Sequence, residues 1–179
     1  MTNLFALLMN MVALATAQGQ CEQAVIDTAD NYSHIENLNV TCIDSEYRAD
    51  FWSPWPEIDS TGVVGWFDVY TNSVFVMDDL GYQYTTEVIE HEIGHAWDWQ
   101  LGGRVNGYPS YFSETNTGFD LEEFARMYSF HAGMWPENEI YPDTIPTNAE
   151  FFAMEQDGWL PVRIDRPVFF QDAEKAGTR

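Results

Sequence analysis

Two strand-like segments followed by one long helical pattern constrain the fold of this chain most strongly. Residues 63–70 and 73–77 are rich in Val, Phe, Trp and Tyr, and Thr71-Asn72 separates them. β-Branched and aromatic residues favour strands, and a two-residue polar break between such runs favours a tight turn. We therefore predict two strands joined by a tight turn, directly before a helix.

The predicted helix has a capping signal, an amphipathic pattern and a stop signal. Thr85 or Thr86 can cap it, and Gly102-Gly103 ends it after Leu101. Its apolar side should pack on the sheet, whereas the side with the two histidines should face a cleft. The first side consists of Ile89, Ile93, Ala96 and Gln100, and the second of Val88, His91, His95 and Asp98.

Two shorter helices are predicted in the C-terminal half. The first covers residues 121–132, where Asp120 and Glu123 have the spacing of a capping pair, and the second covers residues 147–156. A chain of 179 residues without internal repeats is long enough for one domain with a hydrophobic core. We predict an α+β fold with a small twisted sheet, one long helix and a C-terminal helical subdomain.

The first seventeen residues have the composition of a secretory signal peptide. They contain no charged side chain, residues 4–15 are apolar except for Asn10, and residues 15–17 (Ala-Thr-Ala) have the small-x-small form of a cleavage site. A membrane anchor is the alternative, but the apolar run is short for a bilayer. We expect a secreted protein that begins at Gln18 after cleavage.

The two cysteines follow this leader closely. Cys21 and Cys42 form an even pair in a chain expected to be exported, which predicts a disulfide between them. Such a bond closes a loop of roughly twenty residues and stabilises the fold by about 3 kcal/mol. The alternative is two buried thiols.

The charge balance is strongly acidic. Asp and Glu total 29, whereas Lys and Arg total 7, so the net charge is −22 at pH 7. A surface of this sign repels nucleic acid and anionic membranes, so we expect neither as a partner once the leader is removed. Solubility is the simplest consequence, and attraction of cationic substrates is the alternative.

His91-Glu92-Ile93-Gly94-His95 matches the H-E-x-x-H pattern. Residues four apart on a helix lie one above the other, so both imidazoles can bind one zinc ion, and Glu92 can act as general base on a zinc-activated water. Two exposed helix histidines are the alternative, but they leave Gly94 unexplained. A glycine inside a helix costs about 1 kcal/mol against alanine, and close approach to the sheet would explain it.

A catalytic zinc needs a third protein ligand, which we expect from the next helix. If Asp120 caps that helix and Glu123 pairs with it, Glu122 remains free in the first turn. Ala125, on the same face, is small enough to let the two helices approach. We predict Glu122 as the third ligand, with Glu123, Asp120 and His131 as alternatives in that order. Glutamates here also favour the helix dipole without any metal.

The string HEIGHAWDW followed by LEEFAR resembles the small gluzincin metallopeptidases, including the lethal-factor-type catalytic domains. The resemblance covers roughly residues 65–132. It implies a zincin-like fold with a mixed sheet and the active-site helix behind it, an edge strand that holds the peptide, hydrolase activity, and Glu122 as third ligand. Lethal-factor-like enzymes also place a Tyr seven residues before that Glu, where this chain has Thr115. Tyr111 or Tyr108 is then the candidate for stabilising the oxyanion.

Three further residues near the motif carry expectations. Asp98, one turn after His95, either accepts the ring N–H of a ligand histidine or is an exposed acid. His34 is expected to be a surface residue without a partner, and Trp97 to be a core residue.

Together these features predict a secreted zinc metallopeptidase that acts as a monomer on a peptide or protein substrate. Residues 61–170 would form the catalytic domain and residues 171–179 a loose tail. Residues 18–60 would form an N-terminal segment or a propeptide. The alternatives are a secreted zincin-like binding or toxin module with little turnover, and a hydrolase of non-peptide amides.

Overall fold

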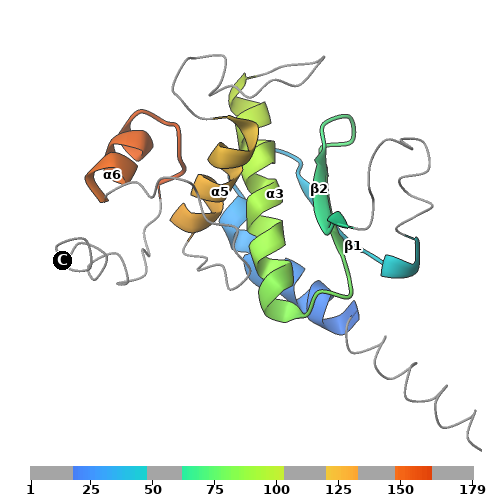
Figure 1. Ribbon diagram of the computed structural model, residues 1–179. Helices are drawn as coiled ribbons and strands as arrows, with labels where there is room; N and C mark the ends of the chain where they lie inside the picture. The colour runs from blue at the N-terminus through green and yellow to red at the C-terminus, as the bar shows by residue number, and fades with distance from the viewer. Residues whose placement is uncertain (1–17, 48–61, 103–119, 133–147, 163–179) are drawn as a thin grey trace, which may run out of the picture.

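The computed structural model describes residues 18–47, 62–102, 120–132 and 148–162 (Figure 1). The predicted leader, Tyr108, Tyr111 and the predicted tail lie outside these ranges. Within them the chain is α+β, as predicted. In chain order its elements are a helix over 18–28, the 3-10 helix η1 (Ala29–Tyr32), β1 (Asn39–Ile43), the 3-10 helix η2 (Ser45–Tyr47), β2 (Gly65–Asp68), β3 (Ser73–Met77), α3 (Tyr82–Gly102), α5 (Leu121–His131) and α6 (Asn148–Gln156).

The described strands form a small mixed sheet in the order β1-β3-β2. β3 pairs parallel with β1 and antiparallel with β2. Both predicted strands are present, although β2 is shorter than the predicted 63–70. Asn72, in the turn between them, has a φ of 50°, a left-handed conformation that asparagine tolerates better than most residues. β2 therefore lies at one edge of the described sheet, with β3 between it and β1.

β1 is a strand that the sequence pattern did not predict. It contains the β-branched residues Val40, Thr41 and Ile43, but it is only five residues long. Its partner β3 follows thirty residues later, where Val40 lies opposite Val74. A parallel pairing needs such a long connection, so no local turn signal marks it.

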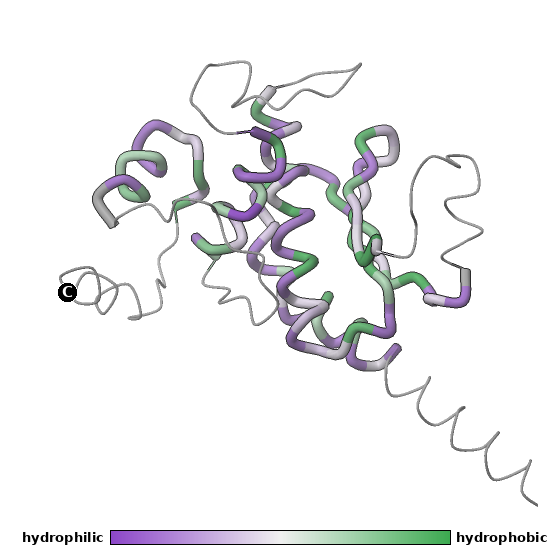
Figure 2. The backbone as a smooth tube through the Cα atoms, viewed as in Figure 1, coloured by the Kyte–Doolittle hydropathy of each residue, from purple (hydrophilic) through white to green (hydrophobic). Residues whose placement is uncertain are grey.

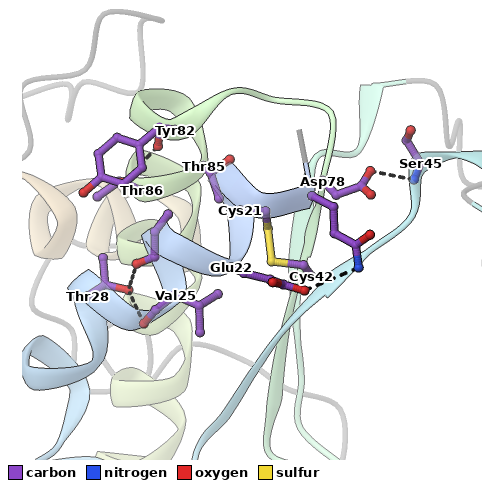
Figure 3. Close-up of a disulfide and its surroundings, with 12 residues drawn as sticks. Cys21, Glu22, Val25, Thr28, Cys42, Ser45, Asp78, Tyr82, Thr85 and Thr86 are labelled. Atoms are coloured by element: carbon purple, nitrogen blue, oxygen red, sulfur yellow. Dashed lines mark hydrogen bonds between the residues drawn. A yellow bond between two sulfur atoms is a disulfide. The ribbon is translucent and has the colours of Figure 1, made fainter. Parts of the chain in front are cut away.

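The predicted disulfide between Cys21 and Cys42 is confirmed. It joins the helix over residues 18–28 to β1, and Cys21 is fully buried (Figure 3). Close to it, the backbone N–H of Ser45 donates to the Asp78 carboxylate at 3.1 Å. The N-terminal segment is thereby fastened to the central strand of the sheet.

α3 begins at Tyr82, so the prediction that Thr85 or Thr86 caps it is wrong. Both threonines lie inside the helix, and their hydroxyls donate to the carbonyls of Gly81 and Tyr82 at 2.8 and 2.9 Å. Buried threonine hydroxyls need an acceptor, and the carbonyl one turn earlier provides it. The two threonines are therefore compatible with the helix interior.

α3 packs against both the sheet and α5, and it lies between them in Figure 1. Figure 2 shows hydrophobic and hydrophilic residues interleaved along this helix. The core between these layers is formed by side chains from all of them, including Val74, Val76, Ile89, Ile93, Phe124 and Tyr128. Contacts on two sides leave few exposed positions on α3, so several of its polar residues are buried as well.

The two C-terminal helices match their predictions closely. Asp120 caps α5 as predicted, because its carboxylate accepts the backbone N–H of Glu123 at 2.7 Å. α6 packs through Phe151, which is 1% exposed. None of the described helices combines the length and the apolarity that a membrane span requires.

Candidate metal centre

Three predicted ligand side chains lie together on facing helices. His91 and His95 are one turn apart on α3, and their ring centroids are 4.9 Å apart. The Nε2 atom of His91 lies 3.3 Å from Oε2 of Glu122, and that of His95 lies 3.5 Å from Oε1. Both imidazoles therefore point toward the carboxylate that α5 supplies.

The spacing of these atoms fits a shared metal ion. Ligand atoms about 2.0–2.2 Å from a tetrahedral zinc ion are separated by roughly 3.3–3.5 Å from one another. A direct hydrogen bond between an imidazolium and a carboxylate would be shorter, about 2.7–2.9 Å. The separations of 3.3 and 3.5 Å run to different oxygens of the carboxylate, and both are longer than such a direct bond and close to the ligand spacing. The residues present thus provide two nitrogen donors and one oxygen donor for a divalent ion.

Gly94 lets α5 come close enough for Glu122 to reach the histidines. A Cβ atom at this position would lie 2.8 Å from Cα of Ala125 and 3.0 Å from Cβ of Tyr128. Real side chains do not approach a backbone atom so closely, so only glycine fits without a shift of α5. The expectation that Gly94 faces the sheet is wrong, since its close contact is with the second helix. Ala125 at the crossing is small, as predicted.

Glu92 belongs to α3, and its side chain is buried next to the edge strand β2. The backbone N–H of Phe67 in β2 donates to its carboxylate. A Cβ atom on Gly65 would lie 3.3 Å from Cγ of Glu92 and would clash with Val88. Burial raises the pKa of Glu92 to about 7, and the neighbouring His91 opposes this shift. This carboxyl group can therefore exchange a proton near neutral pH.

His95 and Glu122 are in the charge states that metal binding requires. Burial lowers the pKa of His95 to about 3, so its imidazole is neutral at pH 7. The contact with His91 lowers the pKa of Glu122 to about 2, so its carboxylate is ionised. Metal ligation needs neutral imidazole and ionised carboxylate. The site therefore has no proton to release from these two groups before an ion binds.

The site opens into a cleft with a volume of about 510 Å³. One wall is formed by residues 62–67, which include most of β2, and the other by Leu121, Glu122 and Arg126 of α5. The histidines and Glu92 form its floor. The sequence pattern missed Arg126 as part of this wall, although its position four residues after Glu122 places both on one helix face.

The alternative third ligands make other contacts. Asp120 caps α5. Oε2 of Glu123 lies 3.8 Å from Nη1 of Arg126. Nε2 of His131 lies 2.8 Å from Oε1 of Glu155. His131 is 2% exposed and links α5 to α6. Among the predicted candidates, Glu122 is thus the residue that the structure places beside both histidines.

The surroundings of the site also include Asp98 and the Nδ1 atom of His91. Asp98 is fully buried, so the alternative that it is an exposed acid is wrong. Its contact with a histidine ring N–H stays a prediction. Nδ1 of His91 is buried, and it has no hydrogen-bond partner among the described residues.

His34 is not the isolated surface residue that the sequence suggested. Its Nε2 atom lies 2.9 Å from the hydroxyl of Tyr128, and its ring packs edge-on against Trp97 at 4.9 Å. Trp97 belongs to the partly buried shell of the core, as predicted, and its indole N–H donates to the carbonyl of Trp159. The contact with Tyr128 spans 94 residues of sequence, so no local pattern could indicate it.

Comparisons with protein-family models, with curated proteins and with solved structures gave no match to this chain. The resemblance of HEIGHAWDW and LEEFAR to gluzincin metallopeptidases therefore stays a prediction. A proposal about function therefore depends on the residues that line the cleft.

Proposed function

We propose that this chain is a zinc-dependent metallopeptidase with a zincin-like fold. The observation that supports this most strongly is the position of Glu122, whose two carboxylate oxygens each face the Nε2 atom of one histidine. Buried Glu92 lies beside them, and the group opens into a cleft. A structural ion pair would not need a second histidine with a strongly lowered pKa, a second buried carboxyl group and an opening to solvent together.

His91, His95 and Glu122 would hold the metal in this proposal. Glu92 also lies close to the histidines, and ligand atoms of His91, Glu92 and His95 come within 4.8 Å of one another. However, the Glu92 carboxylate accepts a hydrogen bond from β2, whereas that of Glu122 faces both rings. We therefore assign Glu122 as the third ligand and leave Glu92 for proton transfer.

Each group then has one chemical role. A zinc ion at this position supplies a Lewis acid that polarises the scissile carbonyl and lowers the pKa of water to about 7. Glu92 accepts the proton of the attacking water and delivers it to the leaving amine. A buried carboxyl group whose pKa is raised by burial is typical of a residue that transfers protons.

The edge strand favours a peptide as substrate. β2 is paired only with β3 among the described strands, and it forms the cleft wall next to Glu92. An extended peptide can add to such an edge through backbone hydrogen bonds. Secretion would agree with the Cys21–Cys42 disulfide, which needs an oxidising compartment. We expect the secreted protein to act as a monomer.

The test is cleavage of an unfolded protein by the wild type and by Glu92→Gln, each with one equivalent of zinc and with a chelator. We expect cleavage by the zinc-loaded wild type, loss of cleavage with chelator, and a fall in kcat of about 10²- to 10⁴-fold in Glu92→Gln, since that is the usual contribution of a general base. Zinc content should be unchanged in Glu92→Gln.

Glu123→Gln is the matched control, because it removes a neighbouring carboxylate on α5 outside the cleft wall. It should retain wild-type cleavage. Equal cleavage by wild type and Glu92→Gln would contradict the proposal. A zinc-loaded wild type that cleaves no peptide or amide would favour a binding module instead.

A further inference from the structure

Arg126 stands out by its charge and its position. Among the residues that the structure describes it is the only Lys or Arg, and it lies in the wall of the cleft, one turn after Glu122. The whole chain has 29 acidic residues and 7 Lys or Arg residues. A cation in this cleft is therefore an exception to the general charge of the molecule.

The contact with Glu123 does not occupy the hydrogen-bond donors of the Arg126 guanidinium group. Their nearest charged atoms are 3.8 Å apart, which is longer than a hydrogen bond, and the arginine side chain is 34% exposed. The Glu123 side chain is only 13% exposed, but at this distance it makes no hydrogen bond with the guanidinium group. A guanidinium group has five N–H donors in a planar fork, so it can bind a further carboxylate through two parallel hydrogen bonds.

Arg126 interacts electrostatically with Glu122, whose carboxylate is directed at the two histidines. Among the described residues that line the cleft, the carboxylates are those of Glu92 and Glu122. A divalent ion held by the histidines would offset both. Local charge therefore favours an anionic group next to Arg126.

We propose that Arg126 is a specificity-determining residue that binds a carboxylate of the peptide substrate. This inference rests on the proposed peptidase function and narrows its substrate class to peptides with an acidic side chain near the scissile bond or with a free C-terminal carboxylate beside it. Its guanidinium forms the two-pronged contact with that carboxylate while the peptide lies along β2.

The experiment uses three peptides of one sequence. The first has Glu near the cleaved bond and an amidated C-terminus, the second has Gln there and a free C-terminus close to the bond, and the third has Gln and an amidated C-terminus. We expect the wild type to have a kcat/KM roughly 10- to 100-fold higher for one of the first two than for the third, which is the usual effect of a charged hydrogen bond. Which of the two is preferred identifies the source of the carboxylate.

Variants then assign the preference to Arg126. Arg126→Gln should lower the ratio of acidic to neutral kcat/KM to near one, and Arg126→Lys should restore part of it, since lysine retains the charge without the planar fork. Glu123→Gln removes the ion-pair partner of Arg126 and should keep the preference. Zinc content measured in every variant separates loss of substrate binding from loss of metal.

A binding measurement provides a readout without turnover. In the Glu92→Gln background, calorimetric titration should give tighter binding of the preferred acidic peptide than of the neutral one, and Arg126→Gln should remove the difference. Cleavage of all three peptides at similar rates, or an unchanged ratio in Arg126→Gln, would overturn this inference while the peptidase proposal stands. Failure of the wild type to cleave or bind any peptide would overturn both.

Discussion

Glu92 and Glu122 are two carboxyl groups at one site with opposite environments. Burial beside β2 raises the pKa of Glu92 to about 7, whereas the contact with His91 lowers the pKa of Glu122 to about 2. A pair of acids whose pKa values differ in this way is typical of sites where one group transfers protons and the other stays ionised. The two roles that we assign follow from this difference.

At the residue level, Glu122→Ala should weaken zinc binding by more than roughly 100-fold. Even loss of a residue that only supports a ligand costs 10- to 100-fold in metal affinity, and here a ligand itself is lost. Titration against a zinc chelator of known affinity measures this change. Glu123→Ala is the control and should bind zinc like the wild type. Equal affinities in the two variants would exclude Glu122 as a ligand.

A second residue-level prediction concerns the metal-free protein. The pKa of Glu92 is about 7 in the fold against 4.5 for an ordinary glutamate, so the fold binds this proton more tightly than the unfolded chain. The contribution of Glu92 to stability therefore falls as pH rises from about 4.5 to 7. Glu92→Gln removes this loss and should raise the free energy of unfolding at pH 8 by about 1–3 kcal/mol.

Denaturant unfolding of metal-free wild type and Glu92→Gln at pH 5 and pH 8 measures this effect. The gain in Glu92→Gln should be larger at pH 8 than at pH 5. A gain that is the same at both pH values would show that burial does not raise the pKa of the Glu92 carboxyl group.

At the level of elements, the crossing of α3 and α5 determines the site. Gly94→Ala would place a methyl group 2.8 Å from the Cα atom of Ala125, so α5 must move and Glu122 with it. We expect a loss of about 1–3 kcal/mol in the free energy of unfolding, as for other overpacked cores, together with weaker zinc binding. Denaturant unfolding and zinc titration check the two effects.

Gly19→Ala is the matched control for this change. Gly19 lies in the N-terminal helix with no atom within 4 Å of a Cβ at that position, so alanine there should be neutral or stabilise by up to about 1 kcal/mol. Gly94→Ala with unchanged zinc affinity would mean that the position of α5 does not control Glu122.

Local patterns predicted the elements whose signals are local. The bounds of β3 were predicted from its Val- and Phe-rich run, and the start of α5 from the capping residue Asp120. β1 was missed because its pairing with β3 depends on residues far along the chain. The helix partner of Gly94 was missed for the same reason, since a helix-interior glycine indicates close packing without indicating what packs there.

The same distinction applies to the site. The four-residue spacing of His91 and His95 is a property of the helix, so their common direction could be predicted, and Glu122 followed from its place in the first turn of α5. Arg126 required knowledge of which side of α5 faces the cleft. Tyr108 and Tyr111 lie outside the described residues, so their role in stabilising an oxyanion stays a prediction.

At the level of the whole molecule, the Cys21–Cys42 disulfide joins the N-terminal helix to β1 of the sheet. Neither of these two elements lines the cleft. Replacing both cysteines with alanine should lower the free energy of unfolding by about 3 kcal/mol, since a loop of this length is no longer closed. Denaturant unfolding measures the loss. The zinc affinity of the folded double variant should equal that of the wild type.

Reductant provides the control for the disulfide. It should destabilise the wild type to the level of the double variant and leave the double variant unchanged. A double variant as stable as the oxidised wild type would show that the N-terminal segment is held by its packing alone.

The most direct test of the account is the metal content of the purified protein after equilibration with zinc and removal of unbound metal. We expect one zinc ion per chain in the wild type and in Glu92→Gln, and almost none in His91→Ala. A wild type that retains no zinc, or a His91→Ala variant that retains one ion per chain, would contradict the claim that these helices build a metal centre.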